Sequence, residues 1–107
     1  MVAIEEARRN RLLAALPAAE LASLAGQLKI ERLNLGDSIY ESGTQLKQAF
    51  FPTSSVISML SVMMDGSSAE IAVVGFEGVV GVALFMGGNT TPSRAVVQSA
   101  GESLVLS

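Results

Sequence analysis

A glycine-rich stretch followed by a single arginine is the part of this chain best suited to chemistry. Residues 75–88 hold several glycines and two short apolar runs, and Arg94 follows them. Glycine lets a backbone turn tightly or lets a ligand approach the main chain. Backbone amides at such a turn, joined by an arginine fork, suit an anion such as a nucleotide phosphate. The alternative, which spacing alone favours, is a glycine-rich corner of a β-barrel with Arg94 directed to solvent.

The chain of 107 residues contains neither histidine nor cysteine, which excludes several classes of chemistry. Disulfides, iron–sulfur clusters and thiol catalysis all need cysteine. Histidine is the commonest metal ligand and general base, so no serine here has the usual partner to activate it. We therefore expect a protein that is not an enzyme and has neither a metal site nor a cofactor. A small β-barrel enzyme is the least favoured interpretation.

The charge pattern argues against direct nucleic-acid and membrane partners. The net charge is −3, and the only basic cluster, Arg8, Arg9 and Arg11, adjoins Glu5 and Glu6. Domains that bind nucleic acid are usually basic on one face. No uncharged stretch reaches the roughly 20 apolar residues of a spanning helix, and the charged N-terminus is unlike a signal peptide. We expect a cytoplasmic location.

Two short helices are predicted at the N-terminus, near residues 11–16 and 17–27. Asn10 can cap the first helix with its side chain. Pro17 fits the first turn of the second, where its missing N–H costs nothing. Leucine and alanine recur through the second helix at the spacing of one buried face, while the charges before residue 12 suit a solvated face.

From Lys29 onward the hydrophobic period changes to two, and turn signals recur. The predicted strands beyond the first are Ser38–Glu41, Ala49–Pro52, Ser55–Met63, Ser68–Val74, Ala95–Gln98 and Ser103–Leu106. Short strands at close spacing favour a sandwich or barrel. We expect a helical segment at residues 1–28 and a β domain at residues 29–107 that is incomplete at its C-terminus.

The clearest pair of strands forms a hairpin around Asp65-Gly66. A two-residue turn there has positive φ at both positions and pairs Met64 with Ser67. The register that follows opposes Val62 to Ala69, Leu60 to Ile71 and Ser58 to Val73 on one mostly apolar face, with Ser61 opposite Glu70 on the other. A slip of one residue would move Glu70 to the apolar face, so the pattern favours this register.

Six short motifs occur in an order typical of one family. They are residues 10–17, Leu35-Gly36-Asp37, Tyr40-Glu41-Ser42-Gly43, residues 50–58, Asp65-Gly66-Ser67-Ser68 and residues 75–81. Together they resemble the sensor domain of Crp/Fnr-type bacterial transcription regulators, the cyclic-nucleotide-binding-like domain, from about residue 10 to the C-terminus. The resemblance implies a mainly β fold, an antiparallel β jelly roll with short N-terminal helices. It also implies an effector-sensing regulatory domain.

The resemblance implies a ligand site as well. Gly81 matches the glycine of the family's phosphate-binding turn, and Arg94 matches the arginine that meets the cyclic phosphate. Val82 stands in place of the glutamate that binds the ribose, Ala95 in place of a small hydroxyl residue, and Ala83 lies in the same turn. Losing such hydrogen bonds costs a few kcal/mol, or ~100-fold in affinity. We therefore expect a degenerate pocket that binds cyclic AMP weakly or not at all.

Two uses remain open for Arg94 in such a pocket. It could hold a smaller anion together with the amides around Gly81, or it could pair with Glu77 or Glu102. The effector itself is not identified by the sequence.

Regulators of this family continue into a dimerisation helix and a winged helix-turn-helix. Neither is present here, so we expect DNA to be bound only through a domain absent from this chain. The chain itself is then either a fragment or a natural truncation. We expect a homodimer or oligomer, because Leu104-Val105-Leu106 suggests an uncovered apolar end. The alternative function is a stand-alone dimerisation or interaction module with a vestigial pocket.

Overall fold

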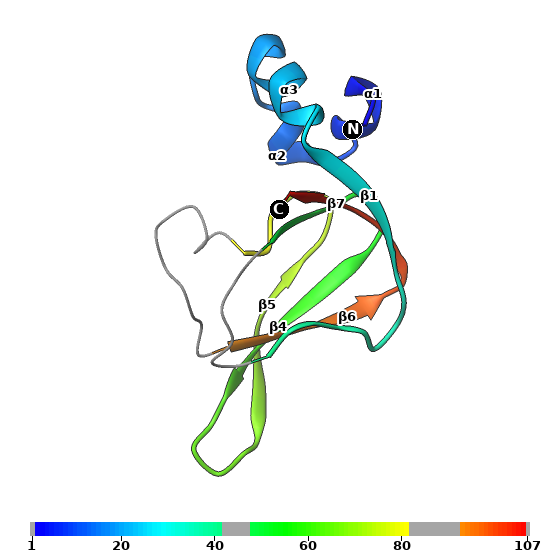
Figure 1. Cartoon of the computed structure of the whole chain (residues 1–107). Coiled ribbons are helices and arrows are strands. Elements are labelled where there is room, and N and C mark those ends of the chain that lie inside the picture. The colour runs from blue at the N-terminus through cyan, green and yellow to red at the C-terminus, as the bar shows by residue number, and fades with distance from the viewer. Residues whose placement is uncertain (1, 42–47, 82–92, 107) are drawn as a thin grey trace.

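Two antiparallel sheets and a group of short helices make up the computed structural model, which describes residues 2–41, 48–81 and 93–106 (Figure 1). The elements are α1 (Ile4–Ala7), α2 (Arg11–Ala14), α3 (Ala18–Ala25), β1 (Leu28–Leu33), β2 (Ser38–Tyr40), β3 (Ala49–Pro52), β4 (Val56–Val62), β5 (Ser68–Val74), β6 (Ser93–Ser99) and β7 (Gly101–Leu106). In these residues no helix is long and apolar enough to span a membrane.

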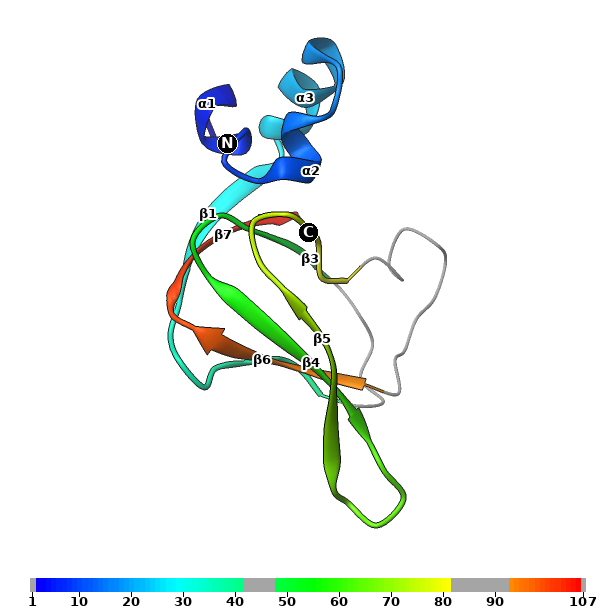
Figure 2. The same ribbon diagram turned by 180° about the vertical axis from the view of Figure 1, so that it is seen from behind.

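The strands form a helix-side sheet and a hairpin sheet. The helix-side sheet has the order β1-β7-β3, and the hairpin sheet has the order β2-β6-β4-β5. Figure 2 shows the helices gathered at one end, next to β1 and β7, and the β4–β5 hairpin projecting at the opposite end. This arrangement confirms the predicted antiparallel β jelly roll with short N-terminal helices.

Both predicted helices are present, as α2 and α3, and the predicted cap is confirmed. The Asn10 side-chain oxygen accepts hydrogen bonds from the N–H groups of Leu12 and Leu13, at 3.0 and 3.2 Å. The sequence reading missed α1, because its charges suggested only a solvated face. Ala7 of α1 is nevertheless fully buried. The predicted division at residue 28 stays a prediction; α3 ends at Ala25 and β1 begins at Leu28.

In the helix-side sheet, strands β3 and β7 are buried on both faces, whereas the middle of β1 is exposed. The outer face of the sheet packs with the helices in a cluster of Ala7, Leu13, Leu21, Ala25, Leu28, Ala49, Phe51, Leu104 and Leu106. Its inner face meets the hairpin sheet in a cluster of Leu33, Phe50, Ile57, Val80, Ala95, Val97 and Val105. β1 contributes to both clusters, because alternate side chains of a strand face opposite sides: Leu28 faces the helices and Leu33 faces the interior.

The C-terminal strand does not form an exposed apolar end. β7 pairs with β1 on one side and with β3 on the other. Leu104, Val105 and Leu106 are all buried, at 1%, 0% and 9% exposure. The prediction that these three residues supply a surface for association is therefore wrong. Any association surface has to be sought elsewhere.

The β4–β5 hairpin forms, but its turn differs from the prediction. The Gly66 N–H donates to the Met63 carbonyl, and the Met63 N–H donates to the Ser67 carbonyl. The loop therefore has three residues, with positive φ at Gly66 alone among the described hairpin residues. Asp65 accepts hydrogen bonds from the Ser67 hydroxyl and N–H, which lower the pKa of its carboxyl. A type I turn followed by a left-handed glycine produces this geometry.

The longer loop shifts half of the predicted register. Ser58 opposes Val73 as predicted, but Ile71 of β5 has no partner and forms a bulge opposite Met59 and Leu60, which places Leu60 opposite Glu70. The Glu70 carboxylate accepts a hydrogen bond from the Ser58 hydroxyl at 3.1 Å. The predicted apolar face is not the buried one, because Val73 is 49% exposed while Ile57 on the opposite face is fully buried. The face of the hairpin that carries Ile57 therefore faces the interior, because it packs in the core with side chains of β6.

Candidate functional site

Gly81 is held against the helix-side sheet by the segment that follows β5. Val80 and Phe50 exchange two backbone hydrogen bonds of 2.8 Å, which extend the sheet past β3. Gly81 then has a φ of +99°, and a Cβ atom there would lie 2.6 Å from the Gln48 carbonyl oxygen. Only glycine fits both conditions, since other residues rarely adopt this φ and a backbone oxygen cannot move aside. The predicted need for glycine at this position therefore has a structural basis.

Two predicted site residues, Val82 and Ala83, lie outside the described residues. In the sequence, Gly81 directly precedes residues 82–92, which the structure does not describe, and Arg94 lies shortly after them.

Arg94 pairs with a carboxylate that the sequence reading did not consider. Its Nε lies 3.3 Å from Oε1 of Glu41, and the two side chains are 35% and 53% exposed. The Ser38 hydroxyl donates a hydrogen bond to the other oxygen of Glu41. These residues meet because β2 pairs with β6, with Tyr40 opposite Ala95. Arg94 therefore already has an internal counter-charge.

The Nε atom of Arg94 is buried, and its N–H is not aligned for a hydrogen bond with Glu41. The contact between Arg94 and Glu41 is therefore a charge pair, and the Nε–H of Arg94 has no hydrogen-bond acceptor among the described groups. Buried donors are normally satisfied, so this one is available to a further polar group.

Neither carboxylate proposed as the partner of Arg94 fills that role. Glu77 instead accepts a hydrogen bond from the Gly75 N–H at 3.1 Å, and this bond lowers the pKa of its carboxyl. Glu102 lies 3.4 Å from Arg9, which also pairs with Glu6. Pairing of Arg94 with Glu77 or Glu102 is therefore wrong, because each has a partner closer to it in the fold.

Ala95 is fully buried in the inner core beside Val97 and Ile57. Its small side chain fills space between the sheets and carries no polar group, so it offers a ligand no hydrogen bond.

The turn after β5 uses its own amides rather than offering them to an anion. The Gly75 N–H is taken by Glu77, and the Gly78 N–H donates to the Gly75 carbonyl at 3.2 Å. The same turn is fastened to α2. The Asn10 side-chain amide donates to the Gly78 carbonyl at 2.9 Å, and the Arg11 N–H donates to the Phe76 carbonyl. The predicted phosphate cradle is therefore not found at residues 75–78.

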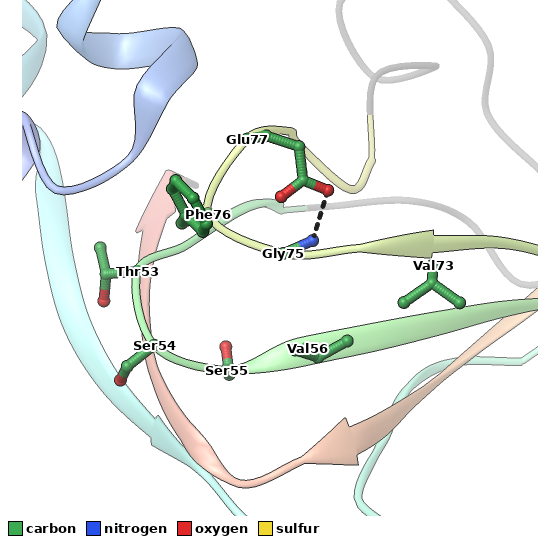
Figure 3. A pocket seen from close by; sticks show the side chains of 8 residues that line it. All are labelled: Thr53, Ser54, Ser55, Val56, Val73, Gly75, Phe76 and Glu77. Atoms are coloured by element: carbon green, nitrogen blue, oxygen red, sulfur yellow. Dashed lines mark hydrogen bonds between the residues drawn. The ribbon is translucent and has the colours of Figure 1, made fainter.

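Two cavities lie near the glycine-rich segment. One, of about 340 Å³, is lined by Glu31, Arg32, Leu33, Asp37, Ser38, Ile39, Gln48 and Phe50. It includes the Ser38 that holds Glu41 and the Gln48 that touches Gly81. The other, of about 290 Å³, is shown in Figure 3 and lies between the β3–β4 corner and the turn after β5. Arg94, Gly81 and Ala95 line neither of these two cavities. The first is connected to the predicted site through Ser38 and Gln48, and the second through Gly75, Phe76 and Glu77 of the glycine-rich stretch.

Sequence reasoning missed Glu41 because the contact is long-range. Glu41 and Arg94 stand far apart in the chain, and only the β2–β6 pairing brings them together. The motif that contains Glu41 was noticed, but nothing in its spacing indicated a partner. No group of three or more acidic side chains that could hold a metal ion occurs in the part of the chain that the structure describes.

Comparison with known proteins identifies the fold. No family model matches the chain, and no curated protein matches it. The N-terminal domain of a transcriptional regulator from Streptomyces coelicolor A3(2) is 22% identical, with a TM-score of 0.78 over 98% of this chain and 74% of that one. The catabolite activator protein of Thermus thermophilus is 17% identical, with a TM-score of 0.75 over 89% of this chain and 45% of that one.

A third similar structure comes from a eukaryotic regulatory protein. The regulatory subunit of a cAMP-independent protein kinase A from Trypanosoma cruzi, bound to guanosine, is 17% identical, with a TM-score of 0.83. The match covers 96% of this chain and 36% of that one. The chain thus spans less than half of the two longer proteins. The fold is the cyclic-nucleotide-binding-like jelly roll of regulatory domains, as the sequence motifs predicted.

Proposed function

We propose that this chain is the effector-sensing regulatory domain of a Crp/Fnr-like transcription regulator whose pocket no longer suits a cyclic nucleotide. The fold and the regulatory character of its structural neighbours support a sensor domain that binds a small molecule and is not itself an enzyme. In this proposal the domain is cytoplasmic, and DNA is contacted by a helix-turn-helix domain of the regulator rather than by this sensor domain.

The observation that carries the proposal is the Arg94–Glu41 pair. A cyclic phosphate needs an arginine whose charge is free, and Glu41 already compensates the charge of Arg94. Admitting a phosphate would place a second anion next to the Glu41 carboxylate, and like charges in a partly buried site repel strongly. Val82 and Ala95 supply no polar side chain to offset that repulsion.

The same geometry suggests what the effector offers instead. The buried Nε–H of Arg94 has no acceptor among the described groups, so a neutral oxygen on the ligand could take it without adding charge. The guanosine-bound neighbour binds a nucleoside that carries no phosphate. We therefore propose that the site predicted from the sequence, at Gly81, Val82, Ala83, Arg94 and Ala95, takes a small effector less anionic than a cyclic nucleotide.

Calorimetric titration tests this proposal with cyclic AMP, cyclic GMP and guanosine as probes. For the unmodified chain we expect no measurable heat with either cyclic nucleotide at millimolar concentration. In Glu41→Gln the charge of Arg94 is released, and we expect cyclic AMP to bind at least about tenfold more tightly than to the unmodified chain. Arg94→Ala is the matched control and abolishes that gain in the double variant. Micromolar binding of cyclic AMP by the unmodified chain, lost in Arg94→Ala, would restore the nucleotide-sensor interpretation.

The alternative is an interaction module with a vestigial pocket. One observation favours it: β5 exposes two apolar side chains, Ile71 at 59% and Val73 at 49%. A thermal-shift screen that includes nucleosides separates the two functions: a stabilising ligand supports the sensor, and self-association without any ligand response supports the module.

A further inference from the structure

The cavity between the β3–β4 corner and the turn after β5 opens on the outer face of the hairpin sheet. It has a volume of about 290 Å³, and Figure 3 shows the residues that line it. Val73, which forms part of its wall, is 49% exposed, whereas the next residue, Val74, packs against the inner core. Successive residues of a strand face opposite sides of the sheet. A molecule in this cavity would therefore lie outside the interior of the jelly roll, where Ala95 is buried.

One wall of the cavity, the β3–β4 corner, is fastened to the connection between β6 and β7. The N–H groups of Thr53, Ser54 and Ser55 all donate to the carbonyl oxygen of Glu102, at 3.1, 3.1 and 3.2 Å. The Ser55 hydroxyl donates to the same oxygen at 3.0 Å, and the Ser54 hydroxyl accepts from the Glu102 N–H at 2.9 Å. The corner is thus rigidly held, and its hydroxyl groups are already engaged.

The opposite wall, the turn after β5, is fastened to α2. The Arg11 N–H donates to the Phe76 carbonyl, and the Arg11 guanidinium lies over the Phe76 ring, 5.0 Å from its centroid. The Asn10 side chain holds the Gly78 carbonyl of the same turn. Both walls are therefore in place before a ligand arrives, which lowers the entropic cost of binding.

Glu77 is the only charged residue that lines this cavity. Its Oε1 accepts from the Gly75 N–H at 3.1 Å, and its Oε2 lies 3.1 Å from the position that a Cβ atom of residue 75 would take, so glycine leaves room for the carboxylate. Arg11 is near enough to lower the pKa of this carboxyl further, but Glu77 forms no ion pair with any described residue. The cavity therefore presents a held negative charge without a paired cation.

From this arrangement we infer a second ligand site, which takes a small primary ammonium compound that carries a short apolar group. The ammonium donates to Oε2 of Glu77, and the apolar group covers Val56, Val73 and Phe76. Pockets for small molecules combine such apolar walls with a few placed polar groups, and hydrogen bonds between ions are the stronger kind. An anion would be repelled by Glu77, and a neutral apolar molecule would cover the carboxylate without pairing it.

The volume sets the size of the ligand. At about 30 Å³ for each water-sized group, the cavity of about 290 Å³ holds roughly ten non-hydrogen atoms. The ammonium form of 2-phenylethylamine has that size and both required parts, so it is a suitable probe. Because Glu77 is exposed to solvent, we expect a dissociation constant in the millimolar range. This inference does not depend on the effector proposed at Arg94, and either can fail without the other.

NMR titration of the full chain with three probes that share a phenyl ring tests the site. The probes are 2-phenylethylamine as the cation, 2-phenylethanol as the neutral analogue and 3-phenylpropionate as the anion. We expect the cation to shift the Gly75 N–H and Val73 methyl resonances saturably below about 20 mM, and the other two probes to bind at least about fivefold more weakly. Resonances of Ala95 and Val97 in the inner core should not move.

Two substitutions with matched controls test the roles of the residues. Glu77→Gln keeps an acceptor for the Gly75 N–H but removes the charge, and it should weaken binding of the cation about fivefold or more. Glu20→Gln makes the same change at an exposed carboxylate of α3 outside the cavity and should leave binding within about twofold. Val73→Ser should weaken binding about threefold because it removes part of the apolar wall, whereas Ile71→Ser, at an exposed position of β5 outside the cavity, should not.

The thermal midpoint of each variant should confirm that it is folded, since all four side chains are exposed. The site would be overturned if the cation produces no saturable shift at Gly75 and Val73, or if the three probes bind equally. Tighter binding of the anion, or unchanged binding of the cation in Glu77→Gln, would overturn it as well.

Discussion

The two sheets of this domain differ in what covers them. In the helix-side sheet, strands β3 and β7 are buried on both faces, and the central strand β7 hydrogen-bonds to a neighbour on each side. The hairpin sheet is covered on one face only, and its outer strand β5 is exposed along most of its length. The difference indicates that stability is concentrated in the helix-side sheet. The hairpin sheet carries the more exposed groups, among them Arg94 and most of β5.

Truncating matched apolar residues in the two sheets should give the largest contrast. Leu104 is 1% exposed and Ile71 is 59% exposed. Leu104→Ala should lower the free energy of unfolding by about 2–5 kcal/mol, because it removes buried surface and leaves a cavity. Ile71→Ala should change it by no more than about 0.5 kcal/mol in the monomer, measured by urea denaturation at low concentration. Equal losses at the two sites would contradict the division of roles.

Asn10 fastens the helices to the helix-side sheet, and its loss should have the next largest effect. Its fully buried side chain caps α2 and also donates to the carbonyls of Pro52 and Gly78, at 2.8 and 2.9 Å. Asn10→Ala should cost about 2–4 kcal/mol, since it removes a cap and leaves buried carbonyls without donors. Asn10→Ser keeps a capping oxygen and should cost clearly less in the same denaturation experiment. If the two variants are equal, the cap contributes nothing.

Gly81 lies between the helix-side sheet and the predicted site residues, and Gly36 provides a control for its substitution. Gly36 has a similar φ of +86°, but a Cβ atom there would meet nothing within 4 Å. Gly36→Ala should therefore cost about 1 kcal/mol of backbone strain alone. Gly81→Ala should cost at least ~1 kcal/mol more, because its Cβ would also collide with the Gln48 carbonyl. Thermal unfolding of both variants isolates the contact, and equal losses would refute the close approach.

The smallest expected effect concerns Glu77 and pH. The Gly75 N–H lowers the pKa of the Glu77 carboxyl in the folded state below its ordinary value of 4.5. A lowered folded pKa means that the carboxylate stabilises the fold above about pH 4.5, and that this contribution is lost as the pH falls through the folded pKa. Glu77→Gln should therefore flatten the dependence of the thermal midpoint on pH below 4.5. Because the side chain is exposed, the change should be small, and an unaltered profile would show that the turn does not depend on this bond.

The architecture could be predicted from the sequence because the local signals for helices and strands agree with the fold. Asn10 and Pro17 mark the helix starts, and period-two patterns mark most strands. The predictions were wrong where contacts between strands far apart in the sequence determine the structure. The Asp65-Gly66 signal predicted a two-residue turn, yet burial of Ile57 against β6 fixed which face of the hairpin turns inward. Leu104–Leu106 was taken for an exposed end because its neighbours, β1 and β3, lie far away in the chain.

The candidate site was predictable only in part, for the same reason. Gly81 could be singled out because it matches the glycine of the family's turn, although its close approach to the Gln48 carbonyl could not be foreseen. The partner of Arg94 could not, because Glu41 reaches it through the β2–β6 pairing, and the neighbours considered, Glu77 and Glu102, were those nearest in sequence. Val82 and Ala83 remain predictions.

The central claim is that Arg94 is already compensated by Glu41 and so does not receive a cyclic phosphate. The most direct measurement follows the side-chain Nε–H resonance of Arg94 by NMR, assigned by its loss in Arg94→Lys, during a titration with cyclic AMP. The account predicts no saturable shift of this resonance up to millimolar nucleotide in the unmodified chain, and a clear saturable shift in Glu41→Gln. A shift that saturates at micromolar cyclic AMP in the unmodified chain would contradict it.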